Sequence, residues 1–313
     1  MQGRFLRRQH ISLLQDYIPV IIVFRDSSGG GRSPEMKKDK TLQELTILDD
    51  FMFGAVMMEP ENCKALLERV LEIPIDHVEI DVEKSLRYHP EYRGVRLDVL
   101  AKDKKGTRYN VEMQASKTPI EKRSRYYHAQ MDMDLLLAGT PYEALPESFV
   151  IFICNYDPFK KRKYRYRIKN CCPELPELEF EDGLHTIILS NKGDNPHEVP
   201  KELVSFLEYT KIATPDDQVE SDDDFVNQVQ KTICQIKSSR EMGERYMKLQ
   251  LLLKEERLAG REEGRVEGRE EIIFDMVRDG EIPAETGAKR LSYTLEEFQE
   301  KLKVYCQENP ESI

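Results

Sequence analysis

Hydrophobic residues between positions 41 and 214 recur with two different periods, and each period predicts a different kind of element. In residues 41–55 they fall at intervals of three and four, which predicts a helix. A second helical pattern covers residues 61–71 and ends before Pro74. In residues 77–86 hydrophobic and polar positions alternate, which predicts a strand. This part of the chain therefore predicts two helices followed by the start of a sheet.

Two further strand-like runs, residues 95–101 and 107–113, flank a short polar segment. This arrangement predicts a β-hairpin. A three-residue loop that ends in a left-handed glycine is a common hairpin closure, and Gly106 is placed to provide that glycine. With such a loop, Asp103 pairs with Thr107.

The predicted hairpin register brings polar side chains together. It places Asp98 directly opposite Glu112, and opposed residues share a face with Cβ atoms about 5 Å apart. Gln114 joins that face because side chains alternate along a strand with period two. Two carboxylates and an amide then converge on one patch, an unfavourable arrangement unless a cation or a proton compensates the charge.

The pattern continues with a helix and more strands. Residues 117–138 are helical, and the continuous apolar run in residues 149–154 is typical of a strand in a sheet covered on both faces. Residues 163–168 alternate basic and apolar positions, as in an edge strand, and residues 184–189 form another short strand. Helices, a three-stranded meander, a helix and further strands predict an α/β domain with a mixed sheet flanked by helices.

Beyond residue 214 only helical patterns remain. Residues 216–224 are an acidic linker, and an apolar stripe follows at Met242, Tyr246, Leu249 and Leu253. Gly-Arg-Glu-Glu-like repeats then begin at Gly260, Gly264 and Gly268. Each interior glycine costs about 1 kcal/mol relative to alanine. The segment is either a solvated connector or a helix that a second helix approaches closely, and the second reading predicts a homodimer formed through the C-terminal helices.

The end of the chain, residues 272–305, predicts two or three short helices. Gly280, Pro283 and Gly287 are expected to separate them. A helix-turn-helix is one arrangement that this pattern allows. We therefore divide the chain into residues 1–35, an extension; residues 36–215, the α/β core; and residues 216–313, an all-α region.

Residues 1–35 differ from the rest of the sequence. Basic and apolar residues lead into a Ser-Ser-Gly-Gly-Gly segment, which has the composition of a flexible linker. The sequence that follows reads like a natural start at Met36. We expect the first 35 residues to be a poorly ordered or mis-assigned extension.

Charge narrows the range of functions. The chain of 313 residues carries a net charge of −11, which argues against a protein that coats nucleic acid without specificity. The charge is unevenly distributed, because residues 160–169 hold seven basic residues and no acidic one. A basic central region within an acidic chain is compatible with a polyanionic substrate.

The six cysteines show no CxxC spacing, so reduced thiols in a cytoplasmic protein are expected and a zinc site is not. No apolar run approaches the length that spans a membrane. Glycine-rich phosphate loops and G-x-S-x-G elbows are absent from the sequence, so nothing in it favours an NTPase or a serine hydrolase.

The polar patch of the hairpin suits phosphodiester chemistry. Carboxylates are the ligands of hard divalent cations such as Mg²⁺ or Mn²⁺, which polarise a phosphoryl oxygen and lower the pKa of bound water. Gln114 cannot change protonation state, so its expected role is to position the water or the phosphate. The alternative is an exposed sheet face on which Arg96 and Arg108 cancel the charges of Asp98 and Glu112.

Asp98 followed by Glu112-Met-Gln114 resembles the PD-(D/E)xK nuclease core with glutamine in place of the lysine. Asp50-Phe-Met-Phe-Gly, Asn110-Val-Glu-Met-Gln and Arg123-Ser-Arg-Tyr-Tyr together look like the Rpn family of recombination-promoting nucleases, or PD-(D/E)xK family transposases. The resemblance covers about residues 38–207, and the glycine-containing tail is also similar. The sequence departs from the pattern in having Leu97, not proline, before Asp98.

The resemblance implies a restriction-endonuclease-like core and a metal-dependent DNA endonuclease. It implies that Asp98 and Glu112 bind Mg²⁺ or Mn²⁺, that Gln114 replaces the lysine, and that Asp50 is an additional acid, with Asp49 an equally placed rival. The residues expected to contact DNA are Arg108, Arg123, Arg125 and Tyr127. The competing hypothesis is a catalytically weak or inactive nuclease fold that acts as a DNA-binding or interaction module.

Overall fold

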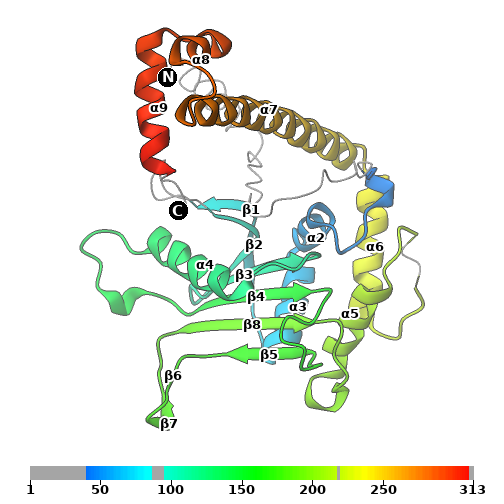
Figure 1. Ribbon diagram of the computed structural model, residues 1–313. Helices are drawn as coiled ribbons and strands as arrows, with labels where there is room; N and C mark the ends of the chain where they lie inside the picture. The colour runs from blue at the N-terminus through cyan, green and yellow to red at the C-terminus, as the bar shows by residue number, and fades with distance from the viewer. Residues whose placement is uncertain (1–39, 87–94, 217–218, 310–313) are drawn as a thin grey trace. The chain divides into compact units, whose positions relative to one another are not determined.

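The computed structural model describes residues 40–86, 95–216 and 219–309 (Figure 1). The extension expected at residues 1–35 lies outside these ranges. The described chain forms two compact units, of which the first ends at Met247 and the second begins at Lys248.

A six-stranded mixed sheet forms the centre of the first unit within the described residues. Its strand order is β1-β2-β3-β4-β8-β5. The strands are β1 (Val78–Leu86), β2 (Val95–Asp103), β3 (Arg108–Gln114), β4 (Ser148–Cys154), β8 (Leu184–Ser190) and β5 (Arg165–Ile168). β1, β2 and β3 form an antiparallel meander, β3, β4 and β8 are parallel, and β5 returns antiparallel at the edge. The predicted mixed sheet, its meander and its edge strand are confirmed.

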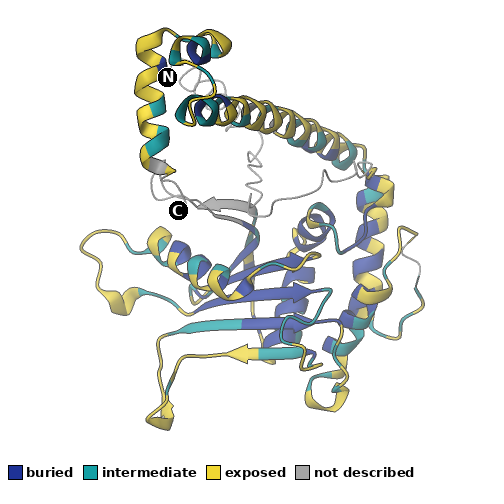
Figure 2. Cartoon of the chain, viewed as in Figure 1, coloured by how far each residue is buried: buried dark blue, intermediate teal, exposed yellow. Residues whose placement is uncertain are grey.

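Helices cover both faces of this sheet. α4 (Ile120–Leu135) packs on β4 on one face, and α2 (Asp50–Met57) and α3 (Pro60–Leu71) pack against β1 and β2 from the other (Figure 1). β4 is buried along its whole length, as its continuous apolar sequence predicts. Burial concentrates in the central strands and in the helix faces that meet them (Figure 2).

Two more helices complete the first unit. α5 (Lys201–Ile212) and α6 (Asp224–Ser238) pack against α3 and against each other. Asn62 of α3 donates a hydrogen bond from its Nδ2 to Oγ1 of Thr232 in α6 at 3.2 Å. The sequence assigned α6 to the helical tail, but in the structure it is part of the unit that contains the sheet.

The first predicted helix is divided into two shorter helices in the structure. Residues 41–55 form a short 3₁₀ helix at Leu42–Glu44 and then α2. Side chain–backbone hydrogen bonds cap the start of the 3₁₀ helix and hold the segment before α2. The Glu44 carboxylate accepts from the Thr41 backbone N–H at 2.7 Å. The Asp49 carboxylate likewise accepts from the Thr46 N–H at 2.8 Å.

A two-stranded sheet was not predicted from the sequence. It consists of β6 (Cys171–Cys172) and β7 (Leu175–Glu179), whose residues are almost all exposed. Since no buried face imposes alternation on these strands, the hydrophobic pattern does not reveal them.

The second unit is helical. The last part of α7 (Arg240–Arg278) folds with α8 (Ala284–Leu291) and α9 (Leu295–Glu308) around a small core that contains Phe274, Ala288 and Phe298. Gly287 lies inside α8 and does not break it, which differs from the sequence prediction. Among the described residues, none of the helices is both long enough and apolar enough to cross a membrane.

Candidate active site

The β2–β3 hairpin has the predicted register. The strands pair from Lys102–Arg108 to Val99–Val111, and the predicted Asp98–Glu112 pair lies one step beyond the last of these pairs. Gly106 closes the loop with φ +90°, the left-handed conformation that glycine adopts without strain. Its N–H donates to the carbonyl oxygen of Asp103 at 3.0 Å.

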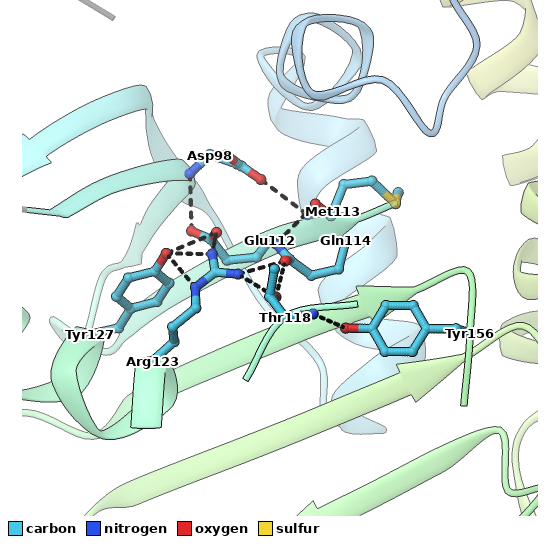
Figure 3. A network of polar contacts seen from close by, with 8 residues as sticks. All are labelled: Asp98, Glu112, Met113, Gln114, Thr118, Arg123, Tyr127 and Tyr156. Atoms are coloured by element: carbon cyan, nitrogen blue, oxygen red, sulfur yellow. Dashed lines mark hydrogen bonds and ion pairs between the residues drawn. The ribbon is translucent and has the colours of Figure 1, made fainter. Parts of the chain in front are cut away.

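Beyond the Val99–Val111 pair, the two carboxylates link the strands. The backbone N–H of Asp98 donates to Oε1 of Glu112 at 3.2 Å (Figure 3). In return, the backbone N–H of Met113 donates to Oδ2 of Asp98 at 3.1 Å. Each acid therefore bonds to the backbone of the opposite strand, and this exchange holds the two acidic side chains together.

Glu112 is the more buried of the two acids, since only 2% of its surface is exposed. Burial raises the pKa of its carboxyl to about 7, against the lowering effects of the nearby Arg123 charge and of the Asp98 N–H. The charge of Asp50 adds a further rise. The carboxyl group of Glu112 can therefore take up or release a proton near neutral pH.

Arg123 reaches this site from α4, on the face that carries Glu112. Its Nη2 lies 3.3 Å from Oε2 of Glu112, and its Nη1 donates to Oε1 of Gln114 at 2.6 Å and to Oγ1 of Thr118 at 2.9 Å. Nη2 and Nε also donate to the Tyr127 hydroxyl, at 2.6 and 3.3 Å. The guanidinium group thus directs all five of its N–H donors to neighbouring side chains.

Burial alone would lower the pKa of Arg123. The Tyr127 hydroxyl and the charges of Glu112 and Asp98 outweigh that effect and raise this pKa above its usual value. The guanidinium group therefore stays charged, and it forms an ion pair with Glu112 at 3.3 Å.

Gln114 is buried at the end of β3, and its side chain is fully engaged. Its Oε1 accepts from Arg123 and from Oγ1 of Thr118 at 3.2 Å, while its Nε2 donates to the Met113 carbonyl oxygen at 3.0 Å. Thr118 is held in turn by Tyr156, whose hydroxyl accepts the Thr118 backbone N–H at 3.3 Å (Figure 3). The sequence pattern does not single out Thr118 or Tyr156, because only the packing of α4 on the sheet gives them a role.

The structure separates the two rival acids of the first helix. Asp49 precedes α2 and forms an ion pair with Lys40, at 2.6 Å between Oδ1 and Nζ, in addition to its bond with Thr46. Asp50 is the first residue of α2, and its charge raises the pKa of Glu112. The charge of Asp50 thus acts on Glu112, and its role as an additional acid stays a prediction.

The residues expected to contact DNA lie in two different settings. Tyr127 is buried, and its hydroxyl donates to Oε2 of Glu112 at 3.4 Å, so it belongs to the same network as Arg123. Arg125 is exposed on α4, and Arg108 lies at the start of β3, four residues before Glu112. Contact of these side chains with DNA stays a prediction.

The donor set is compatible with a hard divalent cation. Among the described residues, no three His, Cys, Asp or Glu side chains come together as a complete ligand set. Mg²⁺ does not need such a set, because it is usually held by one or two carboxylates together with water and substrate phosphates. Asp98 and Glu112 provide two carboxylates on one face, so the residues fit Mg²⁺ or Mn²⁺.

The sequence model of the PD-(D/E)XK nuclease family transposases matches residues 47–251, which include the whole sheet, the acidic pair and α6. The chain belongs to this family. No curated protein and no solved structure matches it. Within a PD-(D/E)XK nuclease-like chain, the mixed sheet flanked by helices is the expected fold.

Proposed function

We propose that this protein is a metal-dependent DNA endonuclease that hydrolyses phosphodiester bonds, acting in DNA recombination or as the protein of a mobile element. The observation that carries the proposal is the convergence of Asp98 and Glu112 from adjacent strands. Membership of a nuclease family supports DNA as the substrate. Asp98, Glu112, Gln114 and Asp50 are the proposed residues of the site.

Asp98 and Glu112 would hold Mg²⁺ or Mn²⁺. When bound, such an ion polarises a phosphoryl oxygen and lowers the pKa of water. The chain's own contribution is to keep the two carboxylates in place through their exchange of backbone hydrogen bonds. Without a bound cation, burial and the charge of Asp50 raise the pKa of Glu112, and cation binding would favour its charged form.

Phosphate contacts are proposed for Arg108 and Arg125, and also for Lys102, which pairs with Arg108 across the hairpin. Side chains of this kind position a duplex without reading its sequence. Arg123 and Tyr127 would then influence DNA through the acidic site, since their polar atoms already bond within it.

The test is nicking of supercoiled plasmid DNA by the purified protein with and without Mg²⁺ or Mn²⁺. We expect metal-dependent nicking, and we expect Asp98→Asn and Glu112→Gln each to reduce it by about 100-fold or more, because even residues behind metal ligands are worth 10–100-fold. Glu121→Gln, an exposed change on α4, is the matched control and should nick normally. Equal nicking by wild type, Asp98→Asn and Glu112→Gln would refute the assignment.

A catalytically weak or inactive nuclease fold that binds DNA is the second candidate. The observation that favours it is the ion pair between Arg123 and Glu112, which occupies one oxygen of a proposed metal ligand. DNA binding without nicking at any Mg²⁺ or Mn²⁺ concentration would support this candidate over the first.

We also propose that two copies pair through α7. Leu251, Leu258 and Ile272 are exposed apolar residues of this helix, and their positions differ by multiples of seven. Side chains at this spacing line one stripe of a helix, as in a coiled coil. A dimer would suit an enzyme that cuts both strands of a duplex.

A further inference from the structure

We propose that Arg123 supplies the positive charge of this site and that Gln114 is the residue that positions it. The inference rests on the proposed nuclease function. Together, the guanidinium of α4 and the amide of β3 would do what a single lysine at position 114 does in the sequence pattern that this chain resembles.

The hydrogen bonds of Gln114 point to a positioning role. Its Oε1 accepts two hydrogen bonds, one of them the 2.6 Å bond from Arg123, and its Nε2 donates to its own strand. A neutral amide engaged in this way cannot act as a cation. It can fix where a cation lies, because its carbonyl oxygen is an acceptor at the position that lysine would fill.

The guanidinium group of Arg123 lies where its positive charge acts on both acids. Its Nη2 lies 3.3 Å from Oε2 of Glu112, and the Asp98 charge also acts on its guanidinium. Tyr127 and Thr118 hold the other N–H groups, so the planar group is fixed by several partners at once. Arginine suits this arrangement because its donors form a rigid fork, whereas the ammonium of lysine is a point charge.

An exchange of the two residues tests the inference directly. We compare wild type with Gln114→Lys, Arg123→Gln and the double variant Gln114→Lys/Arg123→Gln. Gln114→Lys alone removes the acceptor and sets a second cation against Arg123, whereas Arg123→Gln alone removes the cation. The double variant keeps one cation and one amide but exchanges their positions.

In plasmid nicking, each single variant should lose about 10–100-fold, and the double variant should recover most of that loss. Two results would show that Gln114 and Arg123 do not act together. Gln114→Lys would nick DNA faster than wild type, or the double variant would nick DNA no faster than Arg123→Gln. Either of these results would overturn the inference.

Mn²⁺ affinity without DNA provides a readout that does not depend on cleavage. A nearby positive charge weakens cation binding, so Arg123→Gln should bind Mn²⁺ about tenfold more tightly and Gln114→Lys about tenfold more weakly. The double variant and Arg123→Lys, which keep one positive charge, should bind like wild type. Equal affinity in all five proteins would contradict the inference.

This second readout separates the two proposals. If wild type nicks no DNA, the proposed function fails, and the order of Mn²⁺ affinities still decides whether Arg123 supplies positive charge to the acidic pair. Circular dichroism spectra identify any single variant that does not fold. In that case the nicking rates and Mn²⁺ affinities of Arg123→Lys and the double variant are compared instead.

Discussion

At the scale of single residues, Glu112 has a carboxylate almost entirely withdrawn from water, and this burial raises its pKa from 4.5 to about 7. The rise has a cost in the absence of a divalent cation. Between these two pKa values the unfolded chain carries the charged form and the folded chain the neutral form. Because the folded state then binds more protons, stability falls as pH rises through this window.

We predict that Glu112→Gln removes this dependence on pH. The amide has no proton to lose, so with chelator present the variant should gain about 1–3 kcal/mol of stability relative to wild type between pH 4.5 and pH 8. Urea unfolding of both proteins across this range measures the difference.

Glu121→Gln is the control, because it makes the same chemical change on the exposed surface of α4. It should track wild type at every pH. Saturating Mn²⁺ should stabilise wild type and leave Glu112→Gln nearly unchanged, since binding to the folded state adds to stability. A constant difference between Glu112→Gln and wild type across the pH range would contradict a raised Glu112 pKa.

The sequence reveals the acidic pair but not its neighbours. The prediction of Asp98 opposite Glu112 follows from the local geometry of one short hairpin. The structure confirms that register as far as Val99–Val111 and joins the two acids by side chain–backbone hydrogen bonds. The bonds of Arg123 and Tyr127 depend instead on how α4 packs across the sheet. No periodicity encodes that packing, so the sequence does not predict these hydrogen bonds.

At the scale of elements, α7 and α8 place their glycines in opposite settings. Among the residues that the structure describes, a Cβ atom added at Gly264 of α7 would meet nothing within 4 Å. A Cβ atom at Gly287 of α8 would lie 2.6 Å from Cζ of Phe298 and 2.8 Å from Cγ2 of Val277. The first glycine is dispensable for packing, whereas the second lets α8 approach α9 and the end of α7.

We therefore predict opposite effects of the same substitution. Gly264→Ala should stabilise α7 by up to about 1 kcal/mol, through helix propensity alone. Gly287→Ala should destabilise the packing of α8 and α9 by about 1–3 kcal/mol, because it overfills a closed contact. Hydrogen exchange of the peptides that cover these helices measures both changes. Faster exchange in Gly264→Ala would contradict an open position at Gly264, and unchanged exchange in Gly287→Ala would contradict a closed contact at Gly287.

The sequence identifies most elements of the sheet because buried strands must alternate or be continuously apolar. It does not identify β6 and β7, which bury no face, and it reads Gly287 as a helix break although packing places it inside α8. The acidic segment before α6 resembled a linker, yet the buried side chains of that helix join it to the sheet unit. Composition alone cannot distinguish a linker from a loop within one unit.

At the scale of the whole molecule, α7 presents exposed apolar side chains that a second copy could cover. Leu251 and Leu258 are each 58% exposed and seven residues apart. We predict that the full chain dimerises and that Leu251→Glu/Leu258→Glu raises the dimer dissociation constant by about tenfold or more. Light scattering coupled to size-exclusion chromatography measures the mass.

Leu137→Glu is the matched control, because this leucine is 73% exposed and lies outside α7. It should leave the dimer intact. A monomeric wild type, or an equal effect of Leu137→Glu, would contradict pairing through α7.

The most direct test of the metal site is a crystal of the protein grown or soaked with Mn²⁺, with anomalous diffraction recorded at the manganese edge. We predict an anomalous peak that contacts the carboxylates of both Asp98 and Glu112, and its loss in Asp98→Asn. A crystal in which the site is accessible and Mn²⁺ binds elsewhere, or not at all, would contradict the assignment of these two acids as a metal site.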